Sequence, residues 1–127
     1  MRVLLVLWAG SLWSLAAWVA PTLFHLQSDR HLAGILAGRL FSIETYVAAA
    51  VVLLAALLRA GGTFAPGYAA AALLAVNEWA LKPAMTAAHV NGTAAGLSFG
   101  AWHGVSAVLY VLACLAVLWL VWNEDLR

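Results

Sequence analysis

Charged residues are scarce in this 127-residue chain, of which they make up only 9%. A soluble domain carries roughly 25% charged residues, which keep its surface hydrated. With 66% hydrophobic residues the chain cannot build such a surface, so lipid must surround most of it. The formal net charge is only +1 and no basic run occurs, which excludes a nucleic-acid partner.

Cysteine and methionine are nearly absent. Cys114 is the only cysteine, which excludes an internal disulfide and a zinc site made of paired cysteines. It lies in a long apolar run, where a packed and unreactive thiol is expected. Met1 and Met85 are the only methionines, so the chain lacks the methionine-rich tracts that copper handling uses. No Ser-His-Asp set, nucleotide-binding loop or metalloprotease motif occurs either, which disfavours a hydrolytic enzyme.

Long apolar runs are abundant instead. A membrane-spanning helix needs about 20 mostly apolar residues, and four segments approach or exceed that length. We therefore predict an all-α integral membrane protein, a four-transmembrane-helix antiparallel bundle with a single domain over residues 1–127. Pro83 is expected to bend or end the third helix. The helices are expected at about 3–24, 30–58, 68–85 and 97–122.

Four helices would place both termini on one side of the membrane. The positive residues on that side are Arg2, Arg59 and Arg127, whereas the opposite side holds Arg30 and Arg39. Cytoplasmic segments are enriched in Lys and Arg. We therefore predict an inner-membrane protein with cytoplasmic N- and C-termini, although the difference in charge is small.

Polar residues gather in the half of the predicted bundle opposite the termini. All four histidines fall toward that face, whereas the membrane half nearer the termini is almost purely apolar. An ionisable residue inside a membrane is costly and marks a functional site by default. The predicted polar or ligand-binding cluster consists of His25, Arg39, Glu44, Asn77, Glu78, Lys82, His103, Ser106 and Tyr110.

Helical spacing arranges part of this cluster. Glu78 and Lys82 are four residues apart and are predicted to pair, either for function or simply to neutralise each other. His103 is predicted to face the interior with His25 at a similar depth, where the two share a ligand, a proton or a hydrogen-bond network. A hydrogen bond within the bundle is the alternative for either histidine. Glu44 lies off the small-residue face of its helix and has no predicted neighbour.

Small residues and hydroxyls elsewhere predict packing. Gly34 and Gly38 let another helix approach the second helix closely. Serine and threonine in membrane helices usually donate to the carbonyl of the preceding turn, so Ser11, Ser14 and Thr45 are expected to be structural.

Several stretches resemble a known family: residues 18–24, 32–41, 77–79, Pro83 and 99–106. They are similar to the bacterial domain-of-unknown-function family related to human transmembrane protein 205, over nearly the whole chain. The resemblance implies a four-helix plan that is distantly similar to copper-resistance D proteins and to a haem-dependent protoporphyrinogen oxidase. It directs attention to His25, His103 and Lys82. It also implies haem b or a metal ion as candidate cofactor, with His25 and His103 as ligands.

Three function classes follow. The favoured one is a non-enzymatic binding protein or accessory subunit, in contact with the lipid bilayer and with other membrane subunits or a second copy. The second is a haem- or metal-binding protein, with or without redox activity, in which His25 and His103 are the ligands. The third is a small proton- or solute-coupled carrier whose Glu44, Glu78 and Lys82 move the charge.

Overall fold

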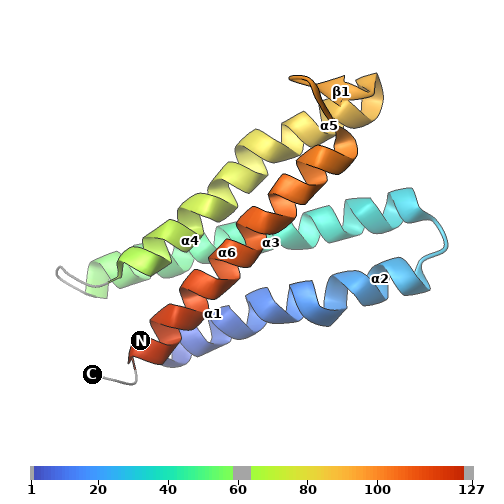
Figure 1. Ribbon diagram of the computed structural model, residues 1–127. Coiled ribbons are helices and arrows are strands. Elements are labelled where there is room, and N and C mark those ends of the chain that lie inside the picture. The colour runs from blue at the N-terminus through green and yellow to red at the C-terminus, as the bar shows by residue number, and fades with distance from the viewer. Residues whose placement is uncertain (1, 59–63, 125–127) are drawn as a thin grey trace.

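The computed structural model describes residues 2–58 and 64–124, and nearly all of them are helical. Within these ranges the helices form four long rods, which follow one another in the sequence (Figure 1). The first rod contains α1 (Arg2–Ser14), the π-helix η1 (Leu15–Val19) and α2 (Ala20–Leu26), and the second rod is α3 (Arg30–Leu58). The third contains α4 (Ala65–Val76), the π-helix η2 (Asn77–Leu81) and α5 (Lys82–Asn91). The fourth is α6 (Phe99–Glu124), preceded by a hairpin of β1 (Thr93–Ala94) and β2 (Leu97–Ser98).

Three of the four rods are long and apolar enough to cross a membrane. These candidate spans are Arg2–Leu26, Arg30–Leu58 and Phe99–Asn123, and they identify a membrane protein by length and composition. The third rod is long enough but less apolar, because Asn77, Glu78 and Lys82 lie in its middle.

The hydrophobic core lies in the half of the molecule nearer the termini. There α1 packs against α6 and α3, and α4 packs against α6. Toward the other end the rods diverge: α2 runs with α3, while α5 runs with α6 (Figure 1). No residue of α2 is buried. The core consists of Leu5, Trp8, Ala9, Leu12, Ala48, Val51, Ala55, Phe64, Ala70, Leu74, Tyr110, Ala113, Cys114, Val117 and Leu120.

Both prolines inside the rods are preceded by a π-helix, and neither ends its rod. The π-helices η1 and η2 each stop two residues before a proline, at Pro21 and Pro83 respectively. Proline has no N–H and its ring collides with the carbonyl four residues earlier, so a wider turn at that point lets the helix continue. Instead of ending near residue 85, as predicted, the third rod runs from Ala65 to Asn91.

A short hairpin connects the third and fourth rods. Its two-residue loop has positive φ at Ala95 (51°) and Gly96 (80°), which is the geometry of a tight hairpin turn. The Trp102 indole donates to the Ala94 carbonyl at 2.8 Å. This bond holds the hairpin against the first turns of α6.

Candidate functional site

The second rod carries polar contacts on two opposite faces. Gly38 and Ser42 face the third rod, where they contact Glu78 and Lys82. Glu44 is two residues further along α3, which turns its side chain by about 200° toward the first rod. The predicted polar cluster is therefore divided between separate sites. We call them the Glu78 site (Gly38, Ser42, Glu78 and Lys82) and the Glu44 site (Ser11 and Glu44).

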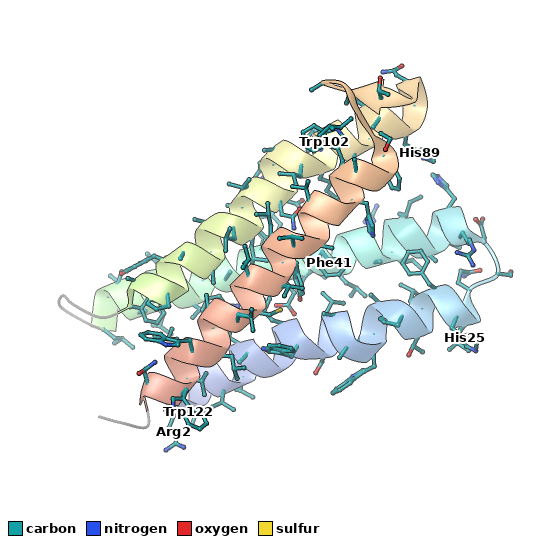
Figure 2. All side chains as sticks on the ribbon, viewed as in Figure 1. Arg2, His25, Phe41, His89, Trp102 and Trp122 are labelled. Atoms are coloured by element: carbon teal, nitrogen blue, oxygen red, sulfur yellow. The ribbon has the colours of Figure 1, made fainter. Side chains whose placement is uncertain are left out.

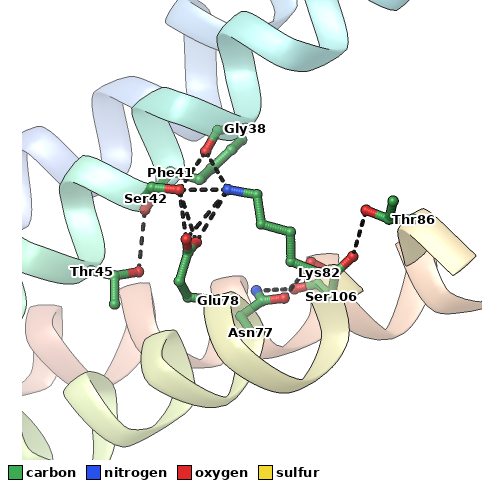
Figure 3. Close-up of polar contacts among 9 residues, drawn as sticks. All are labelled: Gly38, Phe41, Ser42, Thr45, Asn77, Glu78, Lys82, Thr86 and Ser106. Atoms are coloured by element: carbon green, nitrogen blue, oxygen red, sulfur yellow. Dashed lines mark hydrogen bonds and ion pairs between the residues drawn. The ribbon is translucent and has the colours of Figure 1, made fainter. Parts of the chain in front are cut away.

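The Glu78 site is a closed network around one ion pair (Figure 3). Lys82 Nζ lies 3.3 Å from Glu78 Oε2, 2.5 Å from Ser42 Oγ and 3.1 Å from the Gly38 carbonyl oxygen. An ammonium group has three N–H donors, and these three contacts use all of them. Ser42 Oγ also lies 2.8 and 2.9 Å from the two carboxylate oxygens of Glu78. The network is satisfied by protein atoms alone.

A second polar bridge connects the third rod to the fourth. Asn77 Nδ2 donates to the Ser106 carbonyl at 3.0 Å, and Ser106 Oγ donates back to Asn77 Oδ1 at 2.5 Å. Asn77 and Glu78 are consecutive residues of η2 but contact different neighbours, α6 and α3. This π-helix thus connects the third rod both to α3 and to α6. π-Helices of this kind are frequent at functional sites.

The Glu44 site contains the one buried charged side chain in the described part of the chain. Glu44 is 8% exposed, and its Oε1 accepts a hydrogen bond from Ser11 Oγ at 2.6 Å. Its Oε2 is buried and has no hydrogen-bond partner. The structure thus identifies Ser11 as the neighbour of Glu44, for which the sequence predicted none. Ser11 is not only a structural hydroxyl, whereas Thr45 donates to the Phe41 carbonyl as expected for one.

Tyr110 has a contact that explains its position without a ligand. Its hydroxyl donates to the Leu12 carbonyl at 2.7 Å, which joins α6 to α1. Its ring meets Phe41 edge to face, with ring centres 4.9 Å apart. Tyr110 is 6% exposed and belongs to the hydrophobic core.

The histidines are arranged differently from the prediction. His103 is exposed and stacks on Phe99, with ring centres 6.0 Å apart. Phe99 contacts His89 at 5.5 Å, and His89 stacks on His31 at 6.1 Å. We call these four residues the ring row. The contact between the start of α3 and the end of α5 gave no signal in the sequence.

His25 does not join the ring row. It lies at the end of α2 and its side chain points away from the other rods (Figure 2). The prediction placed it level with His103 because the first and fourth rods are antiparallel. The two rods diverge toward this end, however, and α2 packs against α3. The predicted proximity of His25 and His103 is absent from the described residues.

Haem or metal binding by His25 and His103 gains no support from this arrangement, because His103 stacks on Phe99 at the start of α6 and His25 lies at the end of α2. Over residues 2–58 and 64–124, no group of three or more His, Cys, Asp or Glu side chains converges on a common point. Arg39, also predicted to belong to the cluster, is exposed on α3 and belongs to neither site.

Comparison with known proteins gives a family and no function. The family profile described as "Domain of unknown function (DUF4149)" matches residues 3–94, from the first rod to β1. No curated protein and no solved structure matches the chain. The matched residues include Glu44, Asn77, Glu78 and Lys82. Because the profile covers well over half of the sequence, the chain belongs to the DUF4149 family, a domain of unknown function.

Proposed function

We propose that the protein is a small, multi-pass inner-membrane protein that acts without catalysis, as a binding or accessory subunit. The observation that supports this best is the closed Glu78 site. The ammonium of Lys82 has all its donors occupied, and both Glu78 oxygens are bonded. The charges of Glu78 and Lys82 compensate each other within the third rod, and their contacts with Ser42 and Gly38 hold this rod to α3. This arrangement leaves no charged group of the Glu78 site available to react with a substrate.

The proposal includes a membrane crossing by the third rod. The polar residues that lower its hydropathy all have partners on neighbouring rods, which is how polar groups are tolerated inside a bilayer. Four crossings would return the chain to its starting side, and Arg2 and Trp122 do lie at the same end (Figure 2). Arg59 and Arg127, on which the cytoplasmic orientation also depends, are outside the described residues.

Most of the surface of each candidate span is left exposed by the rest of this chain. Only 28% of the most apolar window in each candidate span is buried. Large side chains such as Trp79, Trp119 and Trp122 are more than half exposed. Lipid accounts for part of this surface, and we propose that another membrane helix, from a partner subunit or a second copy, covers one face.

The test is photo-crosslinking in intact membranes. A photoreactive amino acid replaces Leu57, Trp79 or Trp119, which lie on the outer faces of α3, η2 and α6. A subunit role predicts one crosslinked species of fixed mass from one face only. Two differently tagged copies in the same cell then separate a homo-oligomer from a foreign partner. Crosslinking to lipid alone from all three positions would rule out the subunit role.

A metal ion binds an imidazole nitrogen in the plane of the ring, whereas the rings of His31 and His89 are stacked, with an inclination of 16° and centres 6.1 Å apart. Their nitrogens therefore do not point at one position, and this contact gives no support for a metal site. The resemblance to copper-resistance D proteins stays a prediction at the level of the helical plan.

A further inference from the structure

Glu44 occupies the middle of the longest candidate span. The helix α3 contains 29 residues, and Glu44 has fourteen on either side. At 1.5 Å per residue it lies about 21 Å from each helix end. The hydrocarbon core of a bilayer is about 30 Å thick. The carboxyl group therefore lies inside the membrane, far from either end of the helix.

The surroundings of Glu44 do not favour a carboxylate. One oxygen accepts from Ser11, whereas the other is buried without a partner, and none of the described residues forms an ion pair with this side chain. Lys82 faces the other side of α3 and is occupied by Glu78. An ionised carboxylate would leave a full charge uncompensated in an apolar interior. The protonated acid would leave one hydroxyl without an acceptor, which is the smaller penalty.

A shallow hollow of about 360 Å³ lies between the first rod and α3. Its wall on α3 is Leu40, four residues before Glu44 and on the same face of the helix. Neither Ser11 nor Glu44 belongs to its lining, so the hollow does not open on the carboxyl group. The lining is almost entirely apolar and consists of Trp18, Val19, Thr22, Leu23, Leu26 and Leu40.

We propose that Glu44 is a proton-binding site in the membrane interior. Its ligand is a single proton, and Ser11 is a positioning residue that fixes the carboxyl group. This role does not depend on the proposed subunit function. Glu78 is not part of it, because Lys82 already compensates the Glu78 charge.

The test uses the full chain in liposomes and dicyclohexylcarbodiimide, an apolar reagent that enters membranes. A protonated carboxyl group adds to one C=N bond of the reagent, and the adduct rearranges to a stable N-acylurea on the side chain. Peptide mass spectrometry should find the added carbodiimide on Glu44 and not on Glu78, with labelling that declines as the pH rises. Glu44→Gln should abolish the label, and Glu78→Gln should retain it.

Infrared spectroscopy tests the proton without any reagent. The wild-type protein should show the carbonyl stretch of a neutral carboxylic acid, and Glu44→Gln should lose that band while Glu78→Gln keeps it. A wild-type spectrum without such a band would overturn the proton site. An acid band that persists unchanged in Glu44→Gln would overturn its assignment to Glu44. Labelling of Glu78 in place of Glu44 would overturn the assignment of the residue.

Discussion

Ser42 and Glu78 connect the second and third rods, with Ser42 Oγ 2.8 and 2.9 Å from the two oxygens of the Glu78 carboxylate. The ion pair that completes this contact lies entirely within the third rod, where Glu78 and Lys82 are four residues apart. The second rod thus contributes a hydroxyl and a carbonyl, and no charge. Because the charges are compensated on one helix, the contact between the rods does not require a second ionisable group on α3.

The first prediction concerns the coupling between Glu78 and Lys82. Glu78→Met or Lys82→Met should each lower the free energy of unfolding by about 1–2 kcal/mol, because each leaves a charge without its partner. The value is below that of a fully buried pair, since Lys82 is 38% exposed. The double variant should lose less than the sum of the two. Reversible unfolding in mixed detergent micelles provides the three differences.

Thr86→Ala is the matched control for this cycle. Thr86 lies one turn beyond Lys82 and donates only to the Lys82 carbonyl, on the exposed side of α5. Its replacement should change the stability by less than about 0.5 kcal/mol. Strictly additive effects of the Glu78 and Lys82 substitutions would show that the two side chains do not interact in the membrane.

The second prediction concerns the bridge between Asn77 and Ser106. Ser106→Ala removes the hydroxyl that donates to Asn77 Oδ1 but keeps the carbonyl that accepts from Asn77 Nδ2. Hydrogen bonds between membrane helices average about 0.6 kcal/mol and reach about 1.7. Ser106→Ala should therefore cost about 0.6 kcal/mol, and Asn77→Ala, which removes both bonds, about twice that. Equal losses for the two variants would contradict the reciprocal arrangement.

The helices could be predicted from apolar length, but their continuation through proline could not. Proline inside a helix usually means a bend or an end, and the sequence does not show when a π-helix absorbs the strain. Pro21 and Pro83 are each preceded by such a turn. This detail matters for the site, because Asn77 and Glu78 lie inside the second of these turns and contact different rods.

The site was predictable by residue type and only partly by arrangement. Spacing along one helix was sufficient to pair Glu78 with Lys82, because residues four apart lie on the same face of a helix. The neighbour of Glu44 depends on which rod packs against which face of α3, and a single sequence contains no such information. His25 and His103 were placed at one level by counting residues along antiparallel helices, and counting does not reveal that the rods diverge.

The third prediction compares the two members of the Glu44 site. Ser11→Ala should destabilise the protein by about 1 kcal/mol, because it removes the one hydrogen bond that Glu44 accepts. Glu44→Leu should be neutral or stabilising, because it removes a buried oxygen that has no partner. The midpoint of thermal unfolding in detergent should move down for the first variant and not for the second. A large loss of stability in Glu44→Leu would show that this carboxyl group has an essential partner.

The fourth prediction concerns topology. A reporter that functions only in the cytoplasm should be active when fused after Arg127, and inactive when inserted between Ala95 and Gly96 in the hairpin. This pair of results requires α6 to cross the membrane, because α6 is the helix that separates the two positions. An active reporter in the hairpin with an inactive one at the C-terminus would reverse the orientation and keep the fold. Activity at both positions would show that α6 does not cross the membrane.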